Sequence, residues 1–129
     1  MAGDDWQELE RFMRGEVDAA RFPHREHVRM GFAMLQRYDF AESVLHYSRA
    51  LRAMASRAGK PQAFHQTITI AFLSLIAERL EGGQWDDFAG FARDNPDLLD
   101  KGTVARWYRP ERLASERARR TFLLPEPAP

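Results

Sequence analysis

The chain has 129 residues, of which 44% are hydrophobic and 29% charged, with a formal net charge of zero and no cysteine. These values are typical of one globular domain that buries a hydrophobic core, and they exclude disulfides and cysteine-ligated zinc. A neutral chain has no overall positive field, so we expect no nucleic acid as a partner.

Apolar residues recur at helical spacing through the first two thirds of the chain, interrupted by glycine and proline. The pattern predicts four helices, over residues 4–15, 23–37, 39–58 and 61–80. The first helix is expected to begin at a capping box of Asp5 and Glu8, and the third at one of Asp39 and Glu42. Gly15 is expected to end the first helix.

The predicted elements beyond Gly83 are shorter. Residues 84–94, 95–102 and 103–120 each suggest one or two helical turns, and no segment shows strand periodicity. The sequence therefore predicts an all-α protein, a compact helical bundle of three longer helices with shorter flanking helices. We expect a single helical domain over residues 1–124 and an extended Pro-rich tail over 125–129, where proline prevents a helix.

The sequence shows no sign of export or of a membrane anchor. The first residues, MAGDDWQELE, lack the basic start and apolar run of a signal peptide. The longest apolar stretch, ITIAFLSLIA, is about half a membrane span. We therefore expect a cytoplasmic protein with no membrane partner.

Three of the four histidines are predicted to converge. His24 and His27 lie three residues apart at the start of the second helix, and His65 lies near the start of the fourth. Short links make sequential helices antiparallel, so the second and fourth helices should run parallel with their N-termini at one end. Their apolar faces point the three imidazoles inward, and Gly31 would let another helix approach. His46 belongs to a polar row and is expected at the surface.

Three inward imidazoles favour a metal site. We expect His24, His27 and His65 to bind one divalent transition metal, which is zinc, iron or copper, and to leave a position open for water or a small-molecule substrate. Tyr108 and Thr69 are candidate catalytic residues beside the metal. Two further residues, Thr67 and Glu26, are expected behind the ligands, where they would orient a ring or a bound water.

Other interpretations of the same residues remain open. Three histidine ligands suit lyase or hydrolase chemistry with zinc, and equally oxygen chemistry with non-haem iron or copper. The H-x-x-H pattern is also common by chance at helix ends, where it would carry no metal. The chain would then be a non-catalytic helical interaction module or accessory subunit, with an exposed apolar patch for association.

Three segments carry a family resemblance: FPHREHVRMGF, FHQTITIAFL and ARWYRPERLASERARRTFLLPEP. They resemble a group of small bacterial proteins with F-x-H-x-x-H-V and Y/F-H-x-T-I/V-T motifs, over residues 21–125. The resemblance implies that His24, His27, His65, Thr67 and Thr69 form one constellation. It also implies roles for three residues of the last segment, Tyr108, Ser115 and Arg119, and it implies no particular reaction.

Overall fold

The computed structural model describes residues 3–126, and this part of the chain contains helices, turns and loops without a strand. The predicted all-α class is therefore confirmed. The longer helices are α1 (Gly3–Met13), α2 (His24–Arg37), α3 (Phe40–Arg57), α4 (Gln66–Glu81) and α5 (Phe88–Asp94). The shorter ones are η1 (Ala19–Arg21), η2 (Pro61–Ala63), η3 (Pro96–Leu99), η4 (Thr103–Arg106), α6 (Pro110–Leu113) and α7 (Glu116–Arg120).

Membrane insertion is not supported by any of these helices. Within residues 3–126, none of them has both the length and the apolar character that crossing a bilayer requires.

The predicted Pro-rich tail falls partly outside the described residues, which end at Glu126. Glu126 itself pairs with Arg109 at 3.3 Å, so the first part of the tail lies against the body of the protein.

The two predicted capping boxes differ in outcome. Asp39 caps α3, because its carboxylate accepts a hydrogen bond from the Glu42 backbone at 2.8 Å, as predicted. The capping role of Asp5 is wrong, since α1 begins before it at Gly3. Its carboxylate instead accepts from Arg29 of α2 at 3.0 Å, because a guanidinium is a stronger partner than a backbone N–H.

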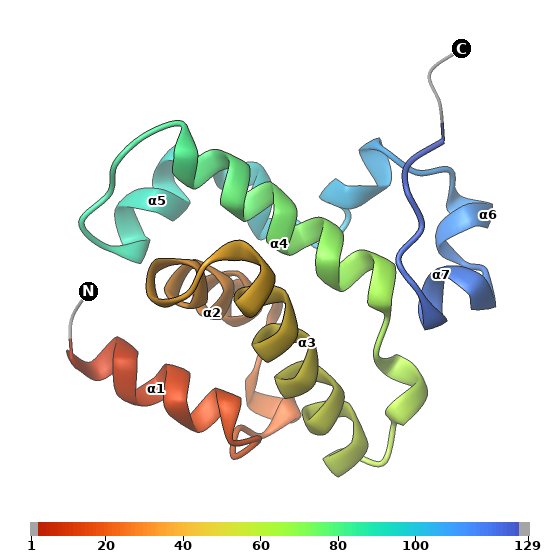
Figure 1. The fold of residues 1–129 in the computed structure, drawn as a ribbon, viewed down its shortest axis with the longest axis horizontal. Coiled ribbons are helices and arrows are strands. Elements are labelled where there is room, and N and C mark those ends of the chain that lie inside the picture. The colour runs from red at the N-terminus through yellow and green to blue at the C-terminus, as the bar shows by residue number, and fades with distance from the viewer. Residues whose placement is uncertain (1–2, 127–129) are drawn as a thin grey trace.

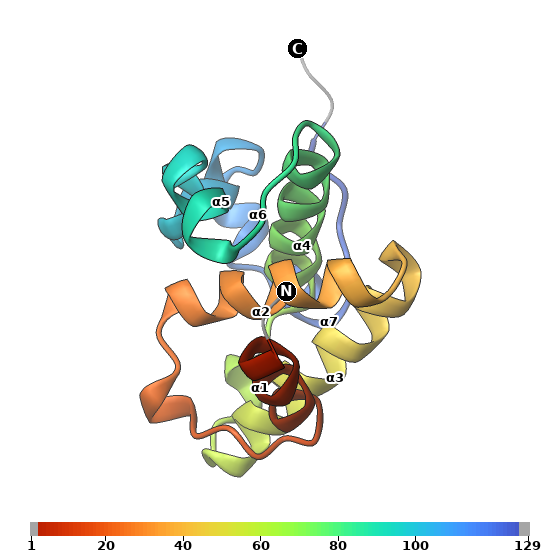
Figure 2. The same cartoon turned by 90° about the vertical axis from the view of Figure 1, so that its left-hand side faces the viewer.

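The long helices cross steeply, as Figure 1 and Figure 2 show together. The predicted parallel arrangement of α2 and α4 is therefore wrong. The link between α2 and α3 consists of Tyr38 and Asp39, and both have extended backbone angles (ψ 158° and 175°). After these two residues α3 runs obliquely back beneath α2, as Figure 2 shows, and the two helices do not form a regular antiparallel pair.

Gly31 lies where α2 crosses α4. A Cβ atom at this position would lie 2.9 Å from Cδ1 of Ile76 and 3.3 Å from Cδ1 of Leu73, so a larger residue here would require the ends of these two side chains to shift. The prediction that Gly31 admits a neighbouring helix is confirmed. Because the crossing is tight, the first turn of α2 and the N-terminal half of α4 come to line a common cavity.

The C-terminal third of the chain packs against α4. Figure 1 shows α6 and α7 beside the beginning of α4, with α5 near its other end. The segment after α7 is anchored by Thr67, whose hydroxyl donates to the Thr121 carbonyl at 2.7 Å and accepts from the Leu123 amide at 3.0 Å. The Tyr108 hydroxyl donates to the Leu123 carbonyl at 2.7 Å. These bonds fix the segment along α4.

Candidate functional site

A cavity with a volume of about 440 Å³ lies among α2, α3, η2 and α4. His24, His27 and His65 all line it, so the structure brings the three predicted histidines to one place. We call it the histidine cavity. Most of its wall is apolar, contributed by Leu51, Met54, Phe64, Ile68, Phe72 and Ile76. A concave, mainly apolar site with a few polar groups is the usual form of a small-molecule site.

His65 is held by the backbone at both ring nitrogens. It is the N-cap of α4, and its Nδ1 accepts a hydrogen bond from the Ile68 amide at 3.1 Å. Its Nε2 lies 2.7 Å from the Leu113 carbonyl, which can only accept, so Nε2 carries the proton. No lone pair of this neutral ring remains for a metal or a substrate. The position of His65 therefore fits a structural role, joining α4 to α6.

His24 keeps one free ring nitrogen. Its Nε2 donates to the Leu98 carbonyl at 2.9 Å, which leaves the lone pair of the neutral ring on Nδ1. Among residues 3–126, no hydrogen bond to that nitrogen is formed. The ring packs edge-on against Phe72, with centroids 4.8 Å apart. Burial lowers the pKa of His24, so the ring is neutral at pH 7.

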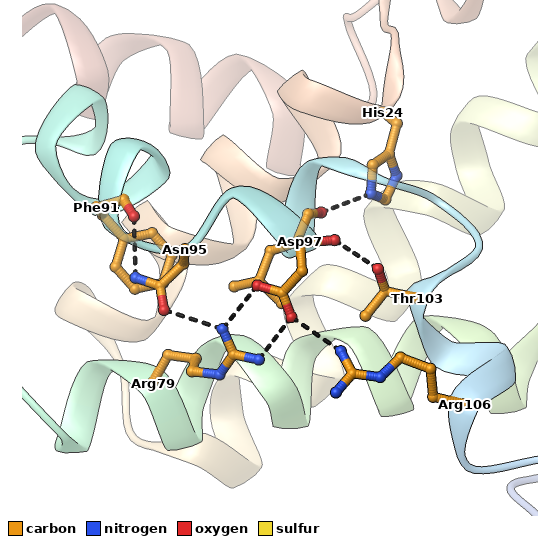
Figure 3. A network of polar contacts seen from close by, with 8 residues as sticks. His24, Arg79, Phe91, Asn95, Asp97, Thr103 and Arg106 are labelled. Carbon is orange, nitrogen blue, oxygen red and sulfur yellow. Dashed lines mark hydrogen bonds and ion pairs between the residues drawn. The ribbon is translucent and has the colours of Figure 1, made fainter.

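A polar network holds the Leu98 carbonyl in place (Figure 3). Asp97, the preceding residue, receives two hydrogen bonds from Arg79 at 2.7 and 2.9 Å, and Arg106 pairs with it at 3.2 Å. The Arg79 guanidinium lowers the pKa of Asp97 to about 2. Thr103 also donates to the Asp97 carbonyl. The network fixes η3 between α4 and η4, and η3 in turn fixes the ring of His24.

His27 is the most strongly perturbed of the four histidines. Its pKa is lowered to about 4, because burial and, to a lesser extent, the neighbouring His24 lower it more than a hydrogen bond with the Phe22 backbone raises it. Its ring contacts Phe22, with centroids 4.7 Å apart, and lies 6.2 Å from the ring of His24. The Tyr47 hydroxyl donates to the His27 carbonyl at 2.8 Å, which ties this turn of α2 to α3. The cavity therefore presents a second neutral imidazole.

The geometry gives two usable imidazole lone pairs and not three. Within residues 3–126, no group of three or more His, Asp or Glu side chains is arranged to hold a metal ion. Binding through His65 would require breaking both of its backbone hydrogen bonds. The metal site of three histidines stays a prediction, and the structure favours His24 and His27 over His65 as its ligands.

Of the other predicted site residues, only Thr69 lines the histidine cavity. Tyr108 lies outside it, with its hydroxyl bound to the Leu123 carbonyl, so a proton-donor role there does not fit. Thr67 holds the C-terminal segment. Glu26 pairs with Arg29 at 2.7 Å on the side of α2 that faces α1. Adjacent positions on a helix point about 100° apart, which is why Glu26 and His27 face different surroundings.

Ser115 and Arg119, which the family resemblance singles out, have structural partners. The Ser115 hydroxyl accepts from the Ala118 amide at 3.1 Å and so caps α7. Arg119 donates to the Gln62 carbonyl, which links α7 to η2. His46 lies outside the cavity and packs on Tyr38, with ring centroids 4.6 Å apart. None of these three residues lines the histidine cavity.

Three polar residues of the histidine cavity were missed by the sequence analysis: Tyr47, Lys60 and Lys101. Tyr47 looked like one member of an apolar helix face. The two lysines could have been singled out from the sequence, because they are the only lysines in a chain that otherwise uses arginine for its positive charges.

Comparison with known proteins leaves the site to be interpreted from its own geometry. The chain matches no protein-family model, no curated protein and no solved structure at a significant level.

Proposed function

We propose that the protein binds a small, largely apolar organic molecule in the histidine cavity. The observation that carries this proposal is that the three histidines of the cavity differ in their hydrogen bonding. Both ring nitrogens of His65 form hydrogen bonds within the protein. His24 and His27 are neutral and each keeps one lone pair, and both rings line the mainly apolar cavity. Such lone pairs accept a hydrogen bond from a hydroxyl or amide of the bound molecule.

The same pair supplies acid–base chemistry. A neutral imidazole takes a proton from a ligand group within hydrogen-bond reach, and the nearby Thr69 hydroxyl can orient that group. The lowered pKa of His27 keeps the ring unprotonated at neutral pH and makes it a weak base. Proton transfer at a bound molecule is therefore the reaction class that these residues suit best.

A neutral dye tests whether the cavity binds small molecules. N-phenylnaphthylamine fluoresces strongly in apolar surroundings, so we expect its emission to rise with the wild-type protein. Ala55→Phe places a ring in the cavity and should abolish this rise. Ala41→Phe, an exposed position on the same helix α3, is the matched control and should bind like the wild type. Equal signals from both variants would contradict the proposal.

The second candidate function is metal binding in the same cavity. His24 and His27 are neutral, have one free lone pair each and lie with ring centroids 6.2 Å apart, so they are the two ligands that the chain can offer most readily. Zinc, iron or copper bound there would take its remaining ligands from water or substrate and act as a Lewis acid or in oxygen chemistry.

Elemental analysis of protein purified without an affinity tag tests this candidate. Near one equivalent of a single transition metal in the wild type, lost in His27→Ala and retained in His46→Ala, would support it. An unchanged metal content in His27→Ala would contradict it.

A further inference from the structure

The rim of the histidine cavity is positively charged. Lys60, which precedes η2, and Lys101, between η3 and η4, are both exposed and both line the cavity. They are the only lysines in the chain, whose lysines and arginines number 19 in total. Two segments that are 41 positions apart in sequence therefore bring the same rare side chain to one opening.

No acidic side chain lines the cavity beside these two lysines. None of the residues that line the cavity is Asp or Glu, and within residues 3–126 neither lysine forms an ion pair. The acid next to Lys101 in sequence, Asp100, accepts a hydrogen bond from the Gly102 amide at 2.8 Å and so serves its own turn. Asp100 is near Lys101, since both charges act on His24 in opposite senses, but it does not line the cavity and forms no ion pair with the lysine. The two lysines thus line a mainly apolar cavity without an ion-pair partner in the described part of the chain.

A second pocket shows that an excess of basic over acidic lining residues is not general in this protein. It lies among α1, η1 and α2, and its wall mixes both signs of charge, with Glu8, Glu16, Asp18 and Glu26 beside Arg11, Arg21 and Arg29. There, acid and base neutralise one another. The lining of the histidine cavity has two lysines and no acid, so a ligand can supply a negative charge there.

Building on the proposed function, we infer that the ligand is a small organic carboxylate with an aromatic or branched aliphatic body. The body fills the apolar cavity, and the carboxylate meets Lys60 and Lys101 at the rim. A volume of about 440 Å³ accommodates a body of one or two rings. A carboxylate is favoured over a phosphate because the cavity lacks both an arginine fork and a glycine-rich loop.

A matched acid and amide test the inference. Naphthylacetate and naphthylacetamide share one body and differ in charge, and each is titrated by calorimetry and by displacement of N-phenylnaphthylamine. We expect the acid to bind the wild type about tenfold more tightly, from two partly exposed ion pairs. The preference should fall to about twofold or less in Lys60→Gln/Lys101→Gln, with amide affinity unchanged. High salt should weaken only the acid.

Arg120→Gln is the control, because it removes an exposed positive charge from α7, outside the cavity. It should leave the preference for the acid intact. Equal affinities for acid and amide in the wild type, or a preference that survives in the double lysine variant, would overturn the inference and leave the small-molecule cavity standing. If the dye, the acid and the amide all fail to bind, the proposed function falls with it.

Discussion

His24 lies between two regions that treat polar groups in opposite ways. On one side, the Arg79–Asp97 network pairs each charge with another: Asp97 meets two guanidinium groups and Arg79 also donates to the Asn95 side chain at 3.0 Å. On the other side, the histidine cavity leaves imidazole lone pairs and two lysines without partners among the described residues.

The difference separates groups that stabilise the fold from groups available to a ligand. A buried or half-buried polar atom without a partner costs free energy, so a chain retains it where a bound molecule supplies the missing contact. Paired charges add stability and have no capacity left for binding. Applied to the histidines, this contrast assigns His65 to the fold and His24 with His27 to the site.

The largest expected effect is that of low pH, which should protonate the histidine cavity and leave the Asp97 network unchanged. The pKa of His27 is about 4 in the folded protein against an ordinary value of 6.5, so the unfolded chain takes up this proton first as the pH falls. Stability is complete above pH 6.5, and roughly 2–3 kcal/mol should be lost by about pH 4. Urea unfolding across this range measures the loss, which His27→Gln should largely remove. The Asp97 network should stay ionised throughout, since its pKa is about 2.

His46→Gln is the control for this experiment, because that histidine lies outside the cavity. The variant should lose stability in acid as the wild type does. An acid response that persists in His27→Gln would show that the cavity imidazole is not its source.

Replacing His65 tests whether it belongs with the paired groups. His65→Ala removes the cap of α4 and the link to Leu113, and we expect a loss of about 2 kcal/mol in the free energy of unfolding. His65→Asn should recover about half of it, because asparagine is a good N-cap. Thermal and denaturant melts give both values. A His65→Asn variant as unstable as His65→Ala would show that the cap contributes little.

Breaking the ion-pair network should cost somewhat less. Arg79→Met leaves Asp97 with one partner, and we expect a loss of about 1–2 kcal/mol. Arg93→Met removes a pair in which the arginine side chain is 76% exposed, against 31% for Arg79, so its effect should stay below about 0.5 kcal/mol. Similar losses in the two variants would remove the distinction between a network and an isolated surface pair.

Apart from the Arg93 control, the smallest loss of stability is expected at Tyr108. Tyr108→Phe removes the hydrogen bond to the Leu123 carbonyl and should cost about 1 kcal/mol. Binding of N-phenylnaphthylamine should not change, because Tyr108 does not line the histidine cavity. A variant of normal stability that no longer binds the dye would restore Tyr108 to the site.

The helices and the meeting of the histidines could be predicted because both follow from local patterns. Apolar spacing located α2, α3 and α4, and Gly31 marked a close helix contact. The route to the convergence was nevertheless wrong, since the helices cross and are not parallel. A two-residue link allows a corner as well as a reversal, and the choice depends on backbone angles that the pattern does not contain.

The roles of the individual histidine rings could not be predicted from local sequence patterns. His65 loses its lone pair to a cap four residues wide and to Leu113, 48 positions away in sequence. Tyr108 and Thr67 are bound to the segment around Leu123 in the same way. Which polar atoms have hydrogen-bond partners depends on such distant residues, so sequence spacing could not show that Thr69 lines the cavity while Tyr108, Thr67 and Glu26 do not.

The hydrogen bonds that fix His24 and His65 also set an order of assembly. Their carbonyl partners, Leu98 and Leu113, follow them by 74 and 48 positions. Contacts of such separation form late, because a long loop must close first. During synthesis, both rings emerge from the ribosome well before the atoms that orient them. The histidine cavity therefore reaches its final geometry only when the last segments have docked on α4, so binding of the proposed ligand would indicate that the whole fold is complete.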